Sequence, residues 1–354
     1  MILYIISRVT LKRIADCLNS EGKSSFTLPE TSEVLRLFGI LCINGVTITD
    51  EETNHLGTAL YLSPSALDHS CEPNSCFSFI GTTLVLKTLR AIKEDEKLTV
   101  NYIDLLQSRE ERQAQLLSQY YFTCSCSLCV KASDSDPYLA VICSKCRGKS
   151  LELKKTELSE KSMPKFRCLE CGHTENDEKY VKTLIQILGD AQFSVEQMRN
   201  KRYQMDISDH KLCEELLKLS EDCLGRVEKY LHNSNVYVAN CADFAMEACV
   251  NLAKWQEAVK FGRMALVGYR LYFPRNFPLL GLLLAKMGKI TMHLGEHLGG
   301  EALRWLQEAN AILSTACPVN FEAVQEVRRM IDQCEEELRI DIDEDRKIAI
   351  SGHE

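Results

Sequence analysis

The sequence lacks a long apolar run at its start. The opening MILYII is only six apolar residues, whereas a signal peptide needs a basic region followed by a longer apolar stretch, and a membrane span needs about 20 residues. This opening therefore predicts no secretion and no membrane partner. We expect the protein to reside in the cytoplasm and the nucleus, with its cysteines reduced.

The chain also lacks an excess of positive charge. Its 42 Lys and Arg residues stand against 50 Asp and Glu residues, which gives a net charge of −8. This balance argues against a protein whose whole surface binds nucleic acid, and it leaves room only for a local basic patch. A hydrophobic content of 45% over 354 residues allows two or three folded domains and excludes disorder throughout.

Cysteine is abundant, with 17 residues, and seven of them form two groups. The spacing C-x-C-x2-C at 124–129 offers three thiols, one short of the tetrahedral set of a structural zinc ion. Two C-x2-C pairs within 143–171 make a complete set close to zinc-ribbon spacing. Buried, reduced cysteine is the alternative, and we expect it for scattered cysteines between helices: Cys213, Cys241, Cys249 and Cys334.

The stretch between Cys143 and Cys171, which contains the second cysteine group, is locally basic. From Lys145 to Arg167, eight Lys and Arg residues stand against three Glu residues, an excess of 8 − 3 = +5. Such a patch could contact nucleic acid or an acidic partner. A solvated loop is the alternative.

Periodicity and turn residues predict the elements of the first half. Thr31 or Ser32 is expected to cap a helix that ends near Cys42, before Asn44-Gly45. The other expected elements are a helix at 1–19, strands at 76–80 and 83–89 joined by Gly81-Thr82, a strand at 98–102 and a helix at 107–119.

The second half has a helical pattern. Helices are expected at 180–192, 209–231, 236–252, 255–270, 278–294, 301–315 and 320–339, and a frayed tail at 341–354. EAVKFGRMA at 257–265 and EALRWLQEA at 301–309 match at an offset of 44. This repeat indicates stacked helical pairs similar to tetratricopeptide repeats.

Three short stretches contain most of the reactive side chains. LDHSCEPNSC at 67–76 combines an acid, an imidazole, thiols and a proline turn, VNYIDL at 100–105 places a tyrosine at a strand end, and YYFTCSCSLC at 120–129 joins aromatic residues to cysteines. With the R-E-E-R helix between them, they resemble the C-terminal half of a SET domain and its post-SET zinc loop, as in the SMYD lysine methyltransferases. The likeness covers about residues 30–340 and is greatest to members that end in a helical repeat domain.

The resemblance implies a multidomain α+β fold, in which a zinc-stapled, β-rich SET part precedes an all-α, tetratricopeptide-like domain. The expected divisions are a helical SET insert (1–56), the C-terminal part of the SET domain (57–123), the post-SET loop with a zinc-ribbon-like insert (124–179), the helical domain (180–340) and the tail (341–354).

The resemblance also implies roles for single residues. Tyr102 in N-Y-I-D would be the catalytic tyrosine and touch the cofactor, S-adenosyl-L-methionine. Asn44, Asp68, His69 and Phe122 would complete the cofactor site, and Tyr120 would line the channel for the substrate lysine. Without the motif, such aromatic residues could equally pack in the core.

The resemblance implies that Cys71 is the fourth ligand of the first zinc ion, together with Cys124, Cys126 and Cys129. Cys76 and His173 are alternatives for this fourth position. The second zinc ion would bind Cys143, Cys146, Cys168 and Cys171. A closed four-cysteine site has no open position, so both zinc ions are expected to be structural.

Lysine methylation explains why a tyrosine suits this place. A neutral amine attacks a methyl group in line, so the protein must align the two groups and exclude water. A tyrosine hydroxyl stays protonated near neutral pH and can orient both groups.

The chain departs from the family in two ways. Asp68 stands where the family has asparagine, and a carboxylate only accepts hydrogen bonds. The family's glycine-containing N-terminal strand and MYND zinc module are not recognisable, so we expect an N-terminally shortened SET domain.

The leading hypothesis is a monomeric protein-lysine N-methyltransferase acting on a histone or another protein. The alternative is a catalytically incomplete SET remnant that binds protein partners through its helical repeats. A zinc-ribbon nucleic-acid binder is a third hypothesis and rests only on the basic stretch.

Overall fold

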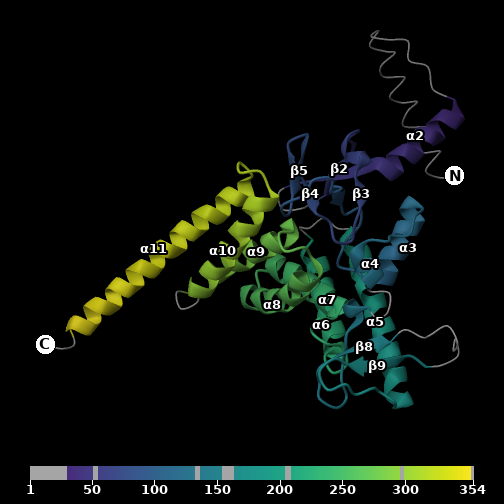
Figure 1. The fold of residues 1–354 in the computed structure, drawn as a ribbon. Coiled ribbons are helices and arrows are strands. Elements are labelled where there is room, and N and C mark those ends of the chain that lie inside the picture. The colour runs from purple at the N-terminus through teal and green to yellow at the C-terminus, as the bar shows by residue number, and fades with distance from the viewer. Residues whose placement is uncertain are drawn as a thin grey trace, which may run out of the picture.

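The computed structural model describes residues 30–50, 55–131, 136–153, 163–203, 209–295 and 299–351. The strands β2 to β5 lie at one end, the helices α5 to α10 form the body, and α11 projects from it as a long rod (Figure 1). The helix expected at 1–19 lies outside these residues. Among the described helices, none combines the length and apolar character that a membrane crossing requires.

The first described element is helix α2 (Thr31–Asn44), which runs directly into strand β1 (Gly45–Thr49). Its N-cap is Glu30, so the expected capping by Thr31 or Ser32 is wrong: the helix already includes them in its first turn. Glycine is required at position 45, because a Cβ there would lie 2.5 Å from the Leu41 carbonyl oxygen. Strand β1 pairs antiparallel with β2 (His55–Leu60), which the sequence did not predict.

The predicted hairpin is confirmed. Strands β4 (Ser75–Ile80) and β5 (Thr83–Thr88) are antiparallel, and Gly81 has a positive φ of 56° at the turn, where glycine carries no steric penalty. The third predicted strand is shorter than expected. β6 (Thr99–Val100) pairs in parallel with β3 (Asp68–His69), which follows the short 3-10 helix η1 (Pro64–Ala66).

The polar helix predicted at 107–119 is α3 (Arg109–Tyr120). Its start is fixed by a capping box, in which Ser108 and Glu111 each accept a hydrogen bond from the other's backbone N–H. Its end is fixed by Tyr121, which adopts the left-handed conformation with φ of 60°. The chain therefore turns sharply between Tyr120 and Phe122, and a short helix α4 (Ser127–Lys131) follows in the cysteine loop.

A small three-stranded sheet holds the second cysteine group. The 3-10 helix η2 (Pro137–Leu139) leads into β7 (Val141–Ile142), which pairs with β8 (Lys149–Leu153), and β8 pairs with β9 (Lys165–Cys168). The sheet is attached to the connection between α6 and α7: the Ile142 N–H donates to the Tyr230 carbonyl at 2.7 Å, and Asn235 Nδ2 donates to the Ala140 carbonyl at 2.9 Å.

All seven helices predicted after residue 179 are present. They are α5 (Glu178–Tyr203), α6 (His210–Val227), α7 (Val236–Asn251), α8 (Trp255–Tyr272), α9 (Pro278–Met292), α10 (Gly299–Ala316) and α11 (Glu322–Ser351). The tail expected from residue 341 is wrong, since α11 continues to Ser351. No glycine or proline interrupts that stretch, and its charged residues tolerate a helix well.

The sequence repeat corresponds to equivalent packing positions. Ala258 and Ala265 of α8, like Ala302 and Ala309 of α10, have no exposed surface, and the larger pair Phe261 and Trp305 is also buried. The helices approach closely where a glycine replaces a side chain: a Cβ on Gly268 would lie 2.3 Å from the Ala239 Cβ. The repeat therefore marks the stacking surfaces of the helical pairs.

Candidate functional site

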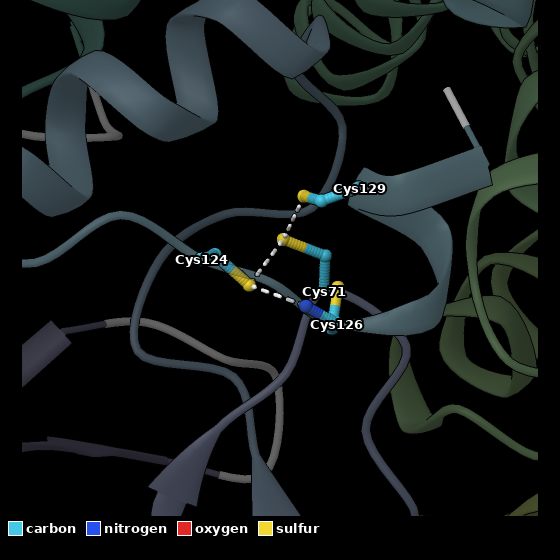
Figure 2. A group of neighbouring side chains, drawn as sticks. All are labelled: Cys71, Cys124, Cys126 and Cys129. Atoms are coloured by element: carbon cyan, nitrogen blue, oxygen red, sulfur yellow. Dashed lines mark hydrogen bonds between the residues drawn. The ribbon is translucent and has the colours of Figure 1, made fainter. Parts of the chain in front are cut away.

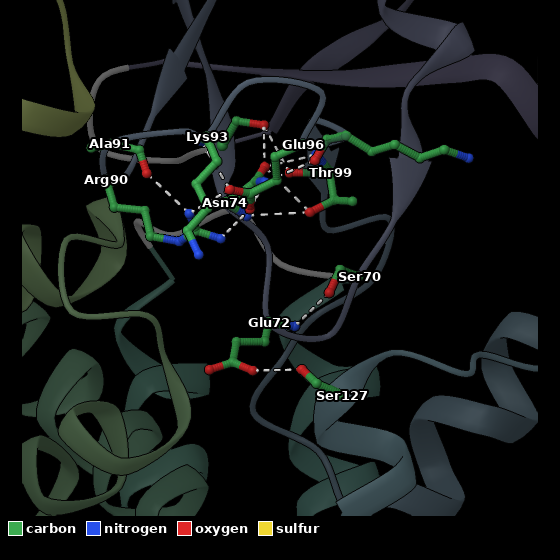
Figure 3. Close-up of polar contacts among 11 residues, drawn as sticks. Ser70, Glu72, Asn74, Arg90, Ala91, Lys93, Glu96, Thr99 and Ser127 are labelled. Atoms are coloured by element: carbon green, nitrogen blue, oxygen red, sulfur yellow. Dashed lines mark hydrogen bonds and ion pairs between the residues drawn. The ribbon is translucent and has the colours of Figure 1, made fainter.

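The three stretches that carry most of the reactive residues meet in the structure, and Asn74 ties the first stretch to the segment that leads into the second. Its buried side chain accepts a hydrogen bond from the Thr99 N–H at 2.8 Å and donates to the Lys97 carbonyl at 2.9 Å and to Glu96 Oε1 at 3.1 Å. Figure 3 shows this network together with the Arg90–Glu96 pair beside it. Ser75 Oγ adds a bond to the Thr99 carbonyl at 2.8 Å. The loop after His69 is thus fixed onto the strand that leads to Tyr102.

Tyr102 lies in a group of aromatic rings. Its ring centroid is 4.9 Å from that of Tyr120, 5.3 Å from that of His69 and 6.4 Å from that of Phe122, which stands edge-on to it. The αL turn at Tyr121 lets both of its neighbours face this group, while Tyr121 itself is 77% exposed. Four of the predicted site residues therefore come together from β3, from the segment after β6 and from the end of α3.

The Tyr102 hydroxyl is held as a donor. It donates to the Leu67 carbonyl oxygen, and burial, the charge of Asp68 and the nearby Tyr120 raise the pKa of Tyr102 above its ordinary value. Burial also raises the pKa of Tyr120. Both phenols are therefore neutral at physiological pH. With its proton directed at a backbone carbonyl, the Tyr102 oxygen keeps its lone pairs for a neighbouring polar or polarised group.

The two remaining predicted cofactor contacts differ in position. Asp68 precedes His69 in β3 and is exposed, and its carboxylate lies 3.6 Å from the Lys97 ammonium group. Asn44 is at the end of α2, where its Nδ2 donates to the Ile40 carbonyl one turn earlier at 3.1 Å.

The structure brings Cys71 to the three cysteines of the post-SET loop. The Cys71 Sγ lies 3.5 Å from the Sγ of Cys129 and 4.0 Å from that of Cys124, and the four sulfur atoms, with that of Cys126, lie within 4.8 Å of one another. Figure 2 shows the thiols converging from two separate loops. We call this set cluster 1. Neither Cys76 nor His173 belongs to it among the described residues.

Cluster 1 has the geometry of a closed zinc site. Tetrahedral zinc with Zn–S bonds of about 2.3 Å places its sulfur atoms about 3.8 Å apart, close to the observed separations. The bond to Cys124 raises the pKa of Cys126, but the bonds to Cys129 and Cys71 outweigh it and hold this pKa at about 5. A lowered pKa favours the thiolate, the form that binds metal.

A buried arginine next to cluster 1 also fits a metal site. Arg112 is 1% exposed and lies 4.5 Å from the centroid of the Tyr138 ring, and its Nε and Nη2 atoms have no hydrogen-bond partner among the described residues. Burial acts to lower the pKa of Arg112, but Tyr138 and the thiols of Cys71 and Cys129 raise it. Four thiolates around one zinc ion carry net negative charge, which would compensate this buried cation.

The second group, cluster 2, is formed by both C-x2-C pairs. The Sγ atoms of Cys143 and Cys171 are 3.8 Å apart, and those of Cys146 and Cys168 are 3.5 Å apart. Backbone N–H groups of Lys145, Gly148 and Glu170 point at these sulfur atoms at 3.4 Å. Such donors stabilise thiolates, so cluster 2 also suits zinc.

The nucleic-acid hypothesis for this insert stays a prediction. Five of its eight basic residues are described, and Lys145, Arg147, Lys165 and Arg167 are exposed. Lys154, Lys155 and Lys161 lie outside the described residues.

Two features of the site were missed from the sequence. Gln113 of α3 donates to the Cys124 carbonyl at 2.8 Å and accepts from its N–H at 2.9 Å, so the post-SET loop is clamped to α3. Asn240 of α7 and Arg199 of α5 both donate to the Leu106 carbonyl, at 3.0 and 2.9 Å. The helical domain thereby holds the segment that follows Tyr102.

Comparisons with known proteins agree with this arrangement. Residues 5–103 match the family model described as SET domain, a range that includes Asp68, His69 and Tyr102. Histone-lysine N-methyltransferase SMYD3 of Homo sapiens is 26% identical over 322 residues, which cover 91% of this chain and 64% of the relative. The chain is thus similar to SET domains over residues 5–103 and to SMYD3 over most of its own length.

A second relative extends the same pattern. N-lysine methyltransferase SMYD2 of Bos taurus is 26% identical over 304 residues, covering 86% of this chain and 61% of the relative. The likeness continues beyond the SET match into the post-SET loop and the helical domain. The chain spans just under two thirds of the length of these SMYD relatives.

Proposed function

We propose that this chain is a SET-type protein-lysine N-methyltransferase that uses S-adenosyl-L-methionine. The observation that carries the proposal is the Tyr102 hydroxyl, which donates to the Leu67 carbonyl inside the ring group of Tyr120, Phe122 and His69. This is a partly buried place with aromatic walls and one oriented oxygen. It suits a cationic alkylammonium group better than an anionic or purely apolar ligand.

The residues have separate tasks in this reaction. When bound, S-adenosyl-L-methionine supplies an electrophilic methyl group. Tyr102 presents its oxygen lone pairs to the reacting groups, and its raised pKa keeps it from acting as a base at physiological pH. Tyr120 narrows the space beside it and accepts the apolar stem of a lysine, and Phe122 with His69 forms the opposite wall. Together these rings exclude water from the lysine amine.

For the cofactor we propose Asp68, the His69 main chain, Phe122 and Asn44 as contacts. The exposed Asp68 carboxylate can receive an ammonium group, at the expense of its ion pair with Lys97. Each of clusters 1 and 2 is proposed to hold one structural zinc ion. The target is a lysine of a histone or of another protein, presented to a monomer in the cytoplasm or the nucleus, and the helical repeats offer a surface for protein partners.

The test is Tyr102→Phe in the zinc-loaded chain, compared with Tyr121→Phe as the matched control. Both substitutions remove one phenolic oxygen, but Tyr121 is exposed and outside the ring group. Tyr102→Phe should lower methyl transfer to a lysine-containing protein at least 100-fold, an effect on the order of losing one transition-state donor. Tyr121→Phe should retain transfer.

Calorimetric titration with S-adenosyl-L-methionine separates this proposal from the scaffold alternative. Binding in the micromolar range, unchanged in Tyr102→Phe, is expected of an enzyme whose tyrosine acts in the chemical step. No binding by the wild-type chain would refute the enzyme proposal and favour a partner-binding role.

A further inference from the structure

Both ring nitrogens of His69 have partners. Its Nδ1 accepts a hydrogen bond from the Tyr102 backbone N–H at 3.0 Å, and its Nε2 lies 3.3 Å from the Cys71 sulfur of cluster 1. Because Nδ1 accepts, the neutral ring carries its proton on Nε2. The Nε2–H group therefore donates to sulfur, and the imidazole joins Tyr102 directly to cluster 1.

The surroundings of His69 keep its ring in this position. Strand β3 is paired with β6 through His69 and Val100, and the Ser70 N–H donates to the Val100 carbonyl at 3.0 Å. The His69 ring also packs against the rings of Tyr102 and Phe122, at centroid distances of 5.3 and 6.1 Å. Backbone pairing and ring packing therefore both favour the orientation that reaches Tyr102 on one side and Cys71 on the other.

One short segment thus holds Tyr102 at both ends. The Leu67 carbonyl accepts from the Tyr102 hydroxyl, and His69 accepts from the Tyr102 N–H. Cys71, two residues after His69, is fixed among the thiols of Cys124 and Cys129. Any shift of Cys71 relative to the post-SET loop would move the segment that sets the position of the tyrosine.

We propose that His69 is a positioning residue that couples the zinc-thiolate centre of cluster 1 to the placement of Tyr102. Its Nε2–H donates to the Cys71 thiolate and strengthens cluster 1, as donors to metal ligands do. Its Nδ1 fixes the Tyr102 backbone. With both nitrogens engaged, the imidazole has no nitrogen left for the cofactor, so the predicted cofactor contact of His69 falls to its main chain and ring face.

Two substitutions separate the two halves of this link. In His69→Asn the amide oxygen stands near the place of Nδ1 and can still accept from the Tyr102 N–H, but the side chain is too short to reach Cys71. In His69→Gln the amide nitrogen stands near the place of Nε2 and can still donate to Cys71, while the acceptor for Tyr102 is lost. His69→Ala removes both contacts.

The first readout is the retention of metal, measured on the full zinc-loaded chain. The chain is exposed to a chelator, and alkylation of cysteines is followed peptide by peptide, so that cluster 1 and cluster 2 are distinguished. His69→Asn and His69→Ala should alkylate at Cys124, Cys126 and Cys129 about 10-fold faster or more. His69→Gln should stay near the wild-type rate.

The second readout is hydrogen exchange of the peptide that contains Tyr102. The exchange rate should be about 10-fold higher in His69→Gln and His69→Ala, because the Tyr102 N–H loses its acceptor. In His69→Asn the rate should stay near that of the wild type while the zinc ions are bound. His173→Gln is the matched control. His173 lies beside cluster 2, where it faces Glu175 at 3.7 Å, and its substitution should alter neither readout at cluster 1 or Tyr102.

The inference is overturned if His69→Ala alkylates and exchanges like the wild type, or if Asn and Gln substitutions affect both readouts equally. The link to catalysis rests on the proposed function, and there we expect His69→Gln to lower kcat of methyl transfer with little change in KM. If the wild-type chain transfers no methyl group, the proposed function fails, while the alkylation and exchange measurements still decide the coupling.

Discussion

Asn74 offers the sharpest test of how the site is built. Its side chain is 5% exposed. Its oxygen accepts from the Thr99 N–H at 2.8 Å and, at longer range, from the Thr99 and Ser75 hydroxyls, and its nitrogen donates to the Lys97 carbonyl and to Glu96. Asn74→Asp keeps the size and the acceptor but replaces the donor nitrogen by oxygen. The new oxygen would face a carbonyl and a carboxylate, so the strap between the loop after His69 and β6 should open more easily.

The cost can be worked out from these contacts. Two lost hydrogen bonds cost about 1 kcal/mol each, and the buried negative charge, whose new oxygen has no donor and faces two acceptors, adds more. Local opening should therefore become easier by about 3–5 kcal/mol at pH 7.5. Protonation of the introduced carboxyl removes part of this free-energy cost. Its pKa in the folded state is therefore raised above the unfolded value of about 3.9. A raised pKa means that stability is retained at low pH and lost as the pH rises through the folded-state pKa.

The loss of local stability caused by Asn74→Asp should therefore grow as the pH rises. If the folded-state pKa is near 6.5, the deficit increases by about 1 kcal/mol between pH 5.5 and 6.5. The assay is hydrogen exchange of peptides covering 70–76 and 96–103, corrected for the intrinsic exchange rate at each pH. Asn251→Asp is the control, since that amide makes one exposed bond to the Glu247 carbonyl at 2.9 Å. A deficit below about 1 kcal/mol, or one independent of pH, would refute the reasoning.

Other parts of the chain give further predictions. The pKa of Glu96 is lowered from 4.5 to about 2 by Arg90, the Lys93 N–H and Asn74, so the contribution of Glu96 to stability is complete above pH 4.5 and lost only toward pH 2. Glu96→Gln should therefore reduce exchange protection of residues 93–99 equally at pH 5.5 and 7.5. A loss of protection that differs between these two pH values would contradict this. Gly268→Ala, whose Cβ would lie 2.3 Å from that of Ala239, should destabilise the helices by about 1–3 kcal/mol in thermal unfolding. Gly189→Ala in α5, where the added Cβ meets open space, should stabilise the helices by up to about 1 kcal/mol. If both substitutions changed stability equally, the close approach of helices at Gly268 would not be the cause of the destabilisation. Chelation of zinc should speed exchange in 124–131 and 143–153 before α8 to α10, and a uniform loss of protection would contradict separate metal-dependent parts.

The cysteine clusters could be predicted because their information is local. A C-x2-C pair places two thiols near each other whatever surrounds it, and only Cys71 had to be supplied by resemblance. The hairpin of β4 and β5 was predictable for a similar reason, since alternating residues flank a glycine turn. Strands β1 and β2 were missed although V-T-I-T in β1 alternates apolar and polar residues, because this pattern covers only four residues and neither strand has a fully buried face.

Other contacts depend on parts of the chain that are far apart in sequence. Arg112 belongs to a helix that is polar in sequence, yet it is buried against Tyr138 from a later part of the chain. Nothing in the R-E-E-R stretch distinguishes the arginine that turns inward from the one that does not. The same holds for Asn240 and Arg199, whose common acceptor, the Leu106 carbonyl, is 134 and 93 residues away.

These long-range contacts determine what the helical domain contributes to the site. The hydroxyl and the N–H of Tyr102 are bound by the segment that contains Leu67 and His69. The chain that follows Tyr102 is held by Asn240 and Arg199, which both bind the Leu106 carbonyl. A buried carbonyl with two donors is expensive to release, because the carbonyl oxygen would lose both of its hydrogen bonds. The helices are therefore part of the framework that holds the tyrosine, in addition to any surface they present to a substrate or partner. Loss of their docking should disturb Tyr102 even when both metal clusters are intact.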